Sequence, residues 1–297
     1  MDDMDFTKPL AEVPAASAPF KAANSRFYNA DVAAALFRNA GKEERFNTSQ
    51  IIFAEDEKTS KGGLFTTASR MYYLSEGEVG LSIAGKPLDV MKAGEVFGEM
   101  AVITGRPRSA TASARIPCVG HSMDAKELQA ALGRSPEFGL MLASVMYDRL
   151  RFIAARLASR PRPSGTPPLQ LSFFDPLLIA ALEASLPRTA IVRYPQQTVI
   201  FKEGQAGKFM YVVKSGRVGI AMGAEVVEIA GPGGTFGEMA VVDQSARTAR
   251  AGTIDECELL SVDRPTLVSV IKSKPAFAMA LLRAVAERLR YMNAQIK

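Results

Sequence analysis

The chain has 297 residues, of which 47% are hydrophobic and 23% charged, and its formal net charge is +5 at pH 7. This length accommodates two domains of ordinary size, and the small positive charge favours an anionic ligand without requiring nucleic acid. The chain has only two cysteines, Cys118 and Cys257, and one histidine, His121. These are too few for a His-based zinc site or a Cys-His catalytic pair, so we expect that the protein binds no metal and is not an enzyme.

Residues 1–28 open the chain. They are rich in Ala and Pro without periodicity, which predicts a disordered segment. No charged start is followed by an apolar stretch, so a signal peptide is not indicated, and the apolar runs of the chain are too short to span a bilayer. We therefore expect a cytoplasmic protein that does not insert into membranes.

Residues 29–160 are predicted to form a first domain. Alternating runs such as YYLSEGEVGLSI (72–83) are broken by Gly-containing turns, as is typical of antiparallel strands wound into a small barrel. The polar stretch 56–70 predicts an enlarged hairpin loop within it. Cys118 falls in an apolar, strand-like stretch and is predicted to be a buried core residue.

A long helix is predicted to end this domain. Apolar residues recur at steps of three and four, a heptad seam of about two heptads, at Ala143, Met146, Leu150, Ile153 and Leu157. The seam either packs on its own barrel or pairs with another helix. The basic stretch that begins at Arg149 is expected to be a solvated helix face, or a surface that docks an acidic partner. Residues 161–168, which end a proline-rich stretch, cannot continue the helix and predict a stiff linker.

The second half of the chain repeats the first. FGEMAV at 97–102 recurs at 236–241, 139 positions later, and the same offset aligns Met71 with Met210 and Cys118 with Cys257. Two unrelated domains would not keep this register, so the chain is an internal duplication with a second domain at 169–297. Its last helix carries the matching seam: Leu282, Val285, Leu289, Met292 and Ile296.

The stretch VFGEMAVITGRPRSATA (96–112) and its repeat TFGEMAVVDQSARTARA (235–251) carry the candidate chemistry. In each, a Gly-Glu pair opens a turn whose backbone N–H groups can converge on an anion. Nine residues after the glutamate comes an arginine whose planar fork suits two phosphate oxygens, followed by a hydroxyl and a small alanine. The glutamate repels phosphate but suits a ribose hydroxyl. A ligand with a phosphate beside a ribose hydroxyl is a nucleotide.

These two stretches resemble the phosphate-binding cassette of the cyclic nucleotide-binding domain family. That family includes the bacterial catabolite activator proteins, the regulatory subunits of cAMP-dependent protein kinase and cyclic nucleotide-gated channels. The resemblance covers nearly the whole chain in two copies and implies a fold that is mainly β with α. It consists of two tandem jelly-roll barrels (double-stranded β-helices), each followed by a long C-terminal helix.

The resemblance also implies a role for each cassette residue. Glu99 and Glu238 would hold the ribose 2′-hydroxyl, and Arg108 and Arg247 the exocyclic phosphate oxygens. The C-terminal helix of each copy would cap the base, near Ile153 in the first and near Met292 and Asn293 in the second. The complete set of expected ligand-binding residues is Phe97, Gly98, Glu99, Met100, Ala101, Arg108, Ser109, Ala110, Phe236, Gly237, Glu238, Met239, Ala240, Arg247, Thr248 and Ala249.

The two cassettes differ in ways that leave the ligand groups in place. The second has Ala246 where the first has Pro107, and the first domain has Asp56 where the second has Gly204. Ser109 resembles the bacterial cAMP-binding form, whereas the residue at Thr248 can also contact guanine in the family. We expect cAMP ahead of cGMP at both sites, and one copy that no longer binds stays an alternative.

Three classes of function follow from the resemblance: a sensor that regulates a partner protein, a transcription factor, and a kinase regulatory subunit. A transcription factor would need a helix-turn-helix after the last helix, but the given sequence ends at Lys297, so no direct DNA binding is expected. A kinase regulatory subunit would need a substrate-like segment upstream, and residues 1–28 contain only Lys8, Lys21 and Arg26 as basic residues.

The sequence thus favours a sensor that signals to an unidentified effector protein, or a tandem scaffold if one or both sites are inactive. Ligand binding would order the cassette and move the two helix seams relative to each other. The seams would pair within one chain or between two chains, as a homodimer.

Overall fold

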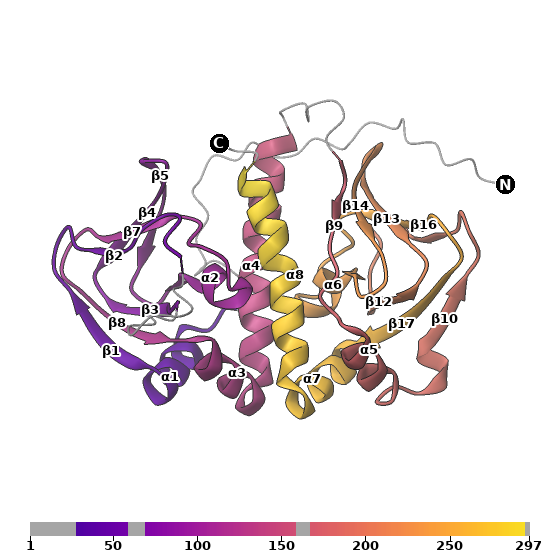
Figure 1. Cartoon of the computed structure of the whole chain (residues 1–297), viewed down its shortest axis with the longest axis horizontal. Helices are drawn as coiled ribbons and strands as arrows, with labels where there is room; N and C mark the ends of the chain where they lie inside the picture. The colour runs from indigo at the N-terminus through magenta and orange to yellow at the C-terminus, as the bar shows by residue number, and fades with distance from the viewer. Residues whose placement is uncertain (1–27, 59–68, 159–166, 295–297) are drawn as a thin grey trace. The chain divides into compact units, whose positions relative to one another are not determined.

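The computed structural model describes residues 28–58, 69–158 and 167–294 (Figure 1). Contacts between residues divide the chain into two units, with the division between Arg149 and Leu150, and each unit is described by itself below. The expected disorder of residues 1–28 lies outside the described residues, apart from Tyr28. Most of the enlarged loop, at 59–68, and most of the linker, at 161–166, lie outside them as well.

The first barrel consists of two four-stranded antiparallel sheets, in the orders β1-β8-β3-β6 and β2-β7-β4-β5. Its strands are β1 (Lys42–Phe46), β2 (Ile51–Phe53), β3 (Met71–Glu76), β4 (Glu78–Ile83), β5 (Lys86–Lys92), β6 (Val96–Phe97), β7 (Thr111–Ala114) and β8 (Cys118–Met123). The cassette helix α2 (Glu99–Thr104) lies between β6 and β7. The site is therefore built on the strands of both sheets.

Three further helices belong to the first barrel: α1 (Ala30–Ala40), α3 (Ala125–Arg134) and α4 (Pro136–Ala158). The Asn29 side chain caps the start of α1, and Asp124 and Glu127 form a capping box at the start of α3. The long C-terminal helix expected from the seam is α4, which contains all the seam residues, and a shorter helix, α3, precedes it and has its C-cap at Ser135 immediately before Pro136. Proline is tolerated there because the first turn of a helix leaves its N–H groups unpaired.

The second barrel repeats this plan in the sheets β10-β17-β12-β15 and β11-β16-β13-β14-β9. Its strands are β9 (Leu169–Gln170), β10 (Ile191–Tyr194), β11 (Val199–Phe201), β12 (Phe209–Ser215), β13 (Val218–Met222), β14 (Glu225–Ala230), β15 (Thr235–Phe236), β16 (Arg250–Thr253) and β17 (Cys257–Asp263). Its helices are α5 (Pro176–Glu183), the 3-10 turn η2 (Arg188–Ala190), the cassette helix α6 (Glu238–Val242), α7 (Arg264–Ser273) and α8 (Pro275–Ala294). The extra strand β9 pairs with β14 in parallel.

Each barrel has an aromatic core. Tyr72 stacks on Phe97 with ring centroids 5.2 Å apart, and Tyr211 stacks on Phe236 in the same way at 5.1 Å. The cysteines occupy one shared core position, as predicted, and their side chains are buried in both barrels. The prediction of two strand-rich jelly-roll barrels in tandem is confirmed. None of the helices in the part of the chain that the structure describes is long and apolar enough to cross a membrane.

Gly216, between β12 and β13, has a backbone that an alanine cannot adopt without strain. Its φ is 82°, and a Cβ there would lie 2.2 Å from the carbonyl oxygen of Glu256. The left-handed conformation costs about 1–2 kcal/mol for a residue with a Cβ, and the forced contact about 1–3 kcal/mol more. We expect Gly216→Ala to lower the free energy of unfolding by about 2–5 kcal/mol in urea titrations followed by circular dichroism.

The matched control is Gly231→Ala. A Cβ at Gly231 meets nothing within 4 Å, and its φ is not positive. This variant should unfold at nearly the urea concentration of the unmutated chain. Equal destabilisation by the two substitutions would contradict the steric account of Gly216.

Candidate ligand site

A glycine with a left-handed backbone opens the cassette helix in each domain. Gly98 has φ 74° and ψ 6° before α2, and Gly237 has φ 73° and ψ 8° before α6. A Cβ at Gly237 would lie 2.5 Å from Nη1 of Arg247, and one at Gly98 would lie 3.2 Å from Nη1 of Arg108. Glycine is required at both positions because of the conformation and because the arginine passes so close.

The two arginines are held beneath these glycines in matching poses. Nη1 of Arg108 donates to Gly98 O at 3.0 Å, and Nη1 of Arg247 donates to Gly237 O at 2.6 Å. Each guanidinium lies over a phenylalanine ring, 3.9 Å from the centroid of Phe53 in the first domain and 4.0 Å from that of its counterpart in the second. Burial lowers the pKa of both arginines below the usual value, yet guanidinium groups stay charged at neutral pH.

These buried charges have unused hydrogen-bonding capacity. Arg108 and Arg247 are each only 6% exposed, and Nε of Arg247 is buried without a hydrogen-bond partner among the described residues. A buried cation with an unpaired donor is costly unless an anion compensates it. The hydroxyls of Ser109 and Thr248, next along the chain, donate to methionine sulfurs, which are weak acceptors that an oxyanion can replace.

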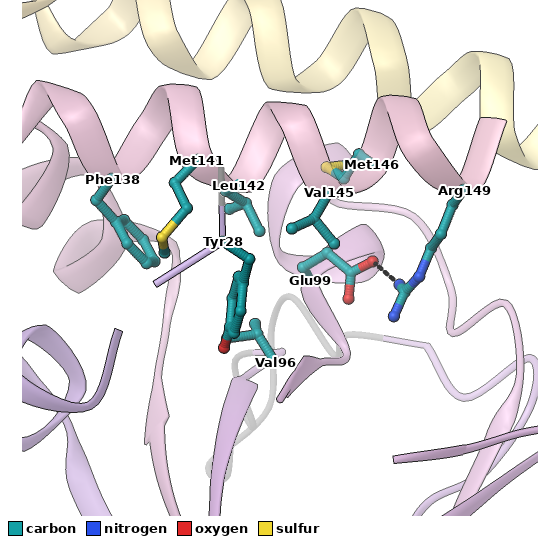
Figure 2. A pocket seen from close by; sticks show the side chains of 9 residues that line it. All are labelled: Tyr28, Val96, Glu99, Phe138, Met141, Leu142, Val145, Met146 and Arg149. Carbon is teal, nitrogen blue, oxygen red and sulfur yellow. Dashed lines mark hydrogen bonds and ion pairs between the residues drawn. The ribbon is translucent and has the colours of Figure 1, made fainter. Parts of the chain in front are cut away.

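Glu99 is buried against helix α4, as Figure 2 shows. Arg149 from α4 donates from Nη1 to Glu99 Oε1 at 2.8 Å, and the glutamate side chain is only 4% exposed. The hollow beside this pair is lined by apolar side chains of α4, among them Met141 and Val145, and has a volume of about 10 Å³. That is room for about one water molecule. The carboxylate is therefore satisfied from the helix that ends the domain.

Glu238 has the equivalent partner in the second domain, and this partner also binds another carboxylate. Arg288 on α8 pairs with Glu238 through Nη1, and Nη2 donates to Thr235 O at 2.7 Å. The same guanidinium grips Glu228 on β14 with two bonds, from Nε at 2.8 Å and from Nη2 at 2.9 Å. Glu228 is 8% exposed and Glu238 3% exposed. One arginine thus joins the last helix, the barrel and the cassette.

Arg149 and Arg288 were not predicted as site residues. Arg149 was assigned to a basic stretch expected to be a solvated helix face, but its side chain is 17% exposed and paired with a buried glutamate. The two arginines are 139 positions apart, the offset of the duplication, and each precedes a leucine of the apolar seam. An arginine that recurs at the same position beside the apolar seam in both copies is the sequence signal that indicates such a partner.

The remaining predicted residues line up along the cassette, and several of them are part of the core. The rings of Phe97 and Phe236 stack in the barrel interiors, and Ala101 and Ala240 are buried in the cassette helices. The side chains at these four positions therefore belong to the core of each domain. Across residues 28–58, 69–158 and 167–294, no group of three His, Cys, Asp or Glu side chains gathers as a metal site.

In each barrel the fold brings together an arginine, a hydroxyl, a carboxylate and a helix arginine, which defines a module that binds a small phosphorylated ligand. Residues 43–135 and 191–274 match the model of the cyclic nucleotide-binding domain. The chain therefore belongs to the cyclic nucleotide-binding domain family, with two copies of the domain in tandem.

Two similar curated relatives match 40% and 35% of the chain. A CRP-like cAMP-activated global transcriptional regulator of Mycobacterium tuberculosis is 37% identical over 124 residues, which cover 40% of this chain and 54% of the relative. The cyclic AMP receptor protein of Thermus thermophilus is 33% identical over 108 residues, which cover 35% and 50%. The chain thus spans about half the length of the curated relatives it matches.

One similar solved structure matches over most of the chain. The regulatory domain of Toxoplasma gondii PKA, in a co-crystal structure with cAMP, is 18% identical, with a TM-score of 0.28. The match covers 80% of this chain and 85% of that one.

Proposed function

We propose that the protein is a cytoplasmic, non-enzymatic sensor that binds a cyclic nucleotide in each domain, cAMP in preference to cGMP, and signals to a partner protein. The observation that carries the proposal is the buried arginine of each cassette, above all Arg247 with its unpaired Nε. A phosphate oxygen would accept from this donor. The gain is a charge-assisted bond in a site from which water is largely excluded.

The carboxylates complete the recognition of the nucleotide. Glu99 and Glu238 are buried and accept bonds from Arg149 and Arg288, so a ribose hydroxyl that donates to either one must share the carboxylate with its arginine or displace the arginine. Because both arginines are on the helices that end the domains, ligand binding would change how those helices are held. The partner would read this change in α4 and α8.

The preference for cAMP rests on the relatives and on Ser109. The more similar curated relatives are a cAMP-activated regulator and a cyclic AMP receptor protein, whereas a cGMP-dependent protein kinase of Drosophila melanogaster is 30% identical over 80 residues only. The output is proposed to be a protein contact, with no direct binding to DNA. We keep Ile153, Met292 and Asn293 as the proposed base caps.

Calorimetric titration of the full chain tests the proposal, with cAMP, cGMP, 5′-AMP and 2′-deoxy-cAMP as ligands. We expect two equivalents of cAMP per chain, weaker binding of cGMP, and no measurable binding of 5′-AMP. A hydrogen bond to a charged group is worth about 1.5–3 kcal/mol, so 2′-deoxy-cAMP should bind about 10- to 100-fold more weakly than cAMP. This loss measures the contribution of Glu99 and Glu238.

Two outcomes would contradict the proposal. Absence of binding to cAMP and to cGMP would favour a tandem scaffold with inactive sites. Equal affinity for cAMP and 2′-deoxy-cAMP would show that the two glutamates do not bind the ribose, and their pairs with the helix arginines would then be structural.

A further inference from the structure

A separate cavity of about 490 Å³ lies beside the cassette of the second domain. Its walls are the loop between β11 and β12, the cassette residues 240–241 and 244–246, and the junction of β17 with α7. Of the residues assigned above to the nucleotide, Ala240 also lines this cavity, whereas Glu238, Arg247 and Thr248 do not. The volume falls in the range of about 300–1,000 Å³ that is usual for small-molecule sites.

The walls of this cavity are tied to one another. The loop pairs with the cassette through a β-bridge between Ala206 and Ala246, and Gly204 N donates to Arg247 O at 2.8 Å. Arg264, the first residue of α7, donates from Nη1 to Val241 O at 3.0 Å and also to the next carbonyl of α6. The walls of the cavity are thus fixed by main-chain hydrogen bonds and by the side chain of Arg264, as a pre-formed site requires.

The lining combines an aromatic surface with positive charge. Phe209 is 41% exposed, which is unusual for a large apolar side chain in a hollow, and Lys208 beside it is exposed. Arg264 adds a second cation, against one carboxylate, Asp263, which already accepts from Thr266 N at the start of α7. The buried Oγ of Ser245 has no hydrogen-bond partner among the described residues.

We propose that this cavity, framed by Phe209, Lys208, Arg264 and Ser245, is a second ligand site that takes an amphipathic anion, with an aromatic body and one negatively charged group. The aromatic body packs on Phe209. The anionic group is held by Lys208, Arg264 and the hydroxyl of Ser245. Such a ligand covers the apolar surface of Phe209 and also accepts a hydrogen bond from the unpaired hydroxyl of Ser245.

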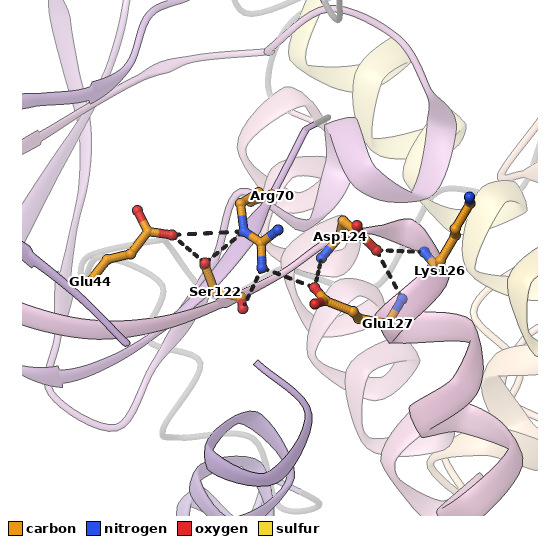
Figure 3. A network of polar contacts seen from close by, with 6 residues as sticks. All are labelled: Glu44, Arg70, Ser122, Asp124, Lys126 and Glu127. Carbon is orange, nitrogen blue, oxygen red and sulfur yellow. Dashed lines mark hydrogen bonds and ion pairs between the residues drawn. The ribbon is translucent and has the colours of Figure 1, made fainter. Parts of the chain in front are cut away.

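The first domain has other residues at the equivalent positions. Arg70 precedes β3 where Phe209 begins β12, and Ala125 stands where Arg264 begins α7. Arg70 is held in a polar network (Figure 3), donating from Nη2 to Glu127 at 2.9 Å and from Nε to Ser122 Oγ at 2.7 Å. A paired cation replaces the aromatic wall, so we expect the second ligand to bind the second domain alone.

Phe209 connects the cavity to the nucleotide site. The ring of Phe209 lines the cavity, and its carbonyl oxygen accepts from Nη2 of Arg247 at 2.7 Å. A ligand packed on the ring holds this carbonyl in place and thereby the phosphate arginine. The coupling rests on the proposed function, and by linkage it acts equally in both directions.

The probe for the test is 8-anilinonaphthalene-1-sulfonate, an aromatic sulfonate, titrated into the full chain and followed by its fluorescence. We expect one saturable site per chain. Phe209→Arg, which introduces the residue of the first domain, and Lys208→Glu should each weaken binding at least about 10-fold, because the first removes the apolar surface and the second reverses a charge. The matched control is Lys202→Glu in the same loop but outside the lining, which should bind the probe like the unmutated chain.

Unchanged probe binding in Phe209→Arg and Lys208→Glu overturns the site. If cAMP displaces all of the probe and the two variants bind the probe like the unmutated chain, the probe occupies the nucleotide site. This result also overturns the proposed second site. The probe titrations of the unmutated chain and of the variants are made without nucleotide, so their result does not depend on the proposed function. The coupling is tested separately: saturating probe should change the affinity for cAMP in the unmutated chain and not in Phe209→Arg, and an unchanged affinity overturns the coupling.

Discussion

Replacement of Arg288 by methionine is expected to lower the free energy of unfolding of the second domain by about 3–5 kcal/mol. Methionine fills much of the same volume but leaves Glu228 and Glu238 without the cation that binds both. The two carboxylates are 8% and 3% exposed, so water cannot replace the lost partner. The measurement is urea unfolding followed by circular dichroism.

A triple variant separates the lost charge from the lost packing. With Glu228→Gln and Glu238→Gln added to Arg288→Met, no uncompensated charge remains in the interior, so most of the stability should return. The matched control is Arg217→Met, which removes an arginine that pairs with Asp255 where both side chains are well exposed. Exposed pairs contribute little, so this variant should unfold like the unmutated chain. A loss no larger in Arg288→Met than in Arg217→Met would contradict the role of Arg288.

The repeat made the cassettes predictable from the sequence because their contacts are local. Gly98, Glu99 and Arg108 lie within eleven residues, and the same residue types recur 139 positions later. One turn and one short helix are enough to bring such groups together. The structure places them as neighbours in both domains, with the arginine hydrogen-bonded to the glycine carbonyl.

The partners of these residues could not be predicted in the same way because they come from distant strands and helices. Phe53, under the Arg108 guanidinium, is 55 positions away, and Arg149 is 50 positions from Glu99. Whether a helix arginine faces solvent or a buried carboxylate depends on how the helix packs, and the pattern of the helix alone does not contain that information. Burial of Arg149 is therefore a result of tertiary packing.

The ends of the cassette helices show a further difference that the repeat concealed. Helix α2 ends at Gly105, whose φ of 67° is the usual left-handed C-cap of a helix. The second copy has Gln244 at that position, and α6 ends earlier, at Val242. Its free carbonyls are capped by Arg264 from α7, which brings α7 against the cassette and forms a wall of the cavity. Gln244 keeps the left-handed backbone, with φ 56°, so the two copies differ in the length of the cassette helix and in the contacts that cap its end.

The largest effect on ligand binding is expected from the cassette arginines. Arg247→Ala should weaken cAMP binding at the second site about 100-fold, and Arg108→Ala should do the same at the first, because each removes charge-assisted bonds to phosphate worth about 3 kcal/mol together. Each variant should therefore titrate one equivalent of cAMP per chain by calorimetry where the unmutated chain titrates two. Lysine at either position keeps the positive charge but lacks the planar guanidinium group with its two parallel donors. It should therefore restore only part of the affinity for cAMP.

The control in the first cassette is Arg106→Ala, two residues before Arg108 and exposed, which should leave both equivalents in place. Because Arg247 also donates to Phe209 O and Gly237 O, circular dichroism must show that the alanine variant is folded before its binding is interpreted. A folded Arg247→Ala chain that still titrates two equivalents of cAMP would contradict the second site, and the equivalent result for Arg108→Ala would contradict the first. Loss of both equivalents in either single variant would instead show that the two sites bind cooperatively, because each alanine removes contacts in its own domain.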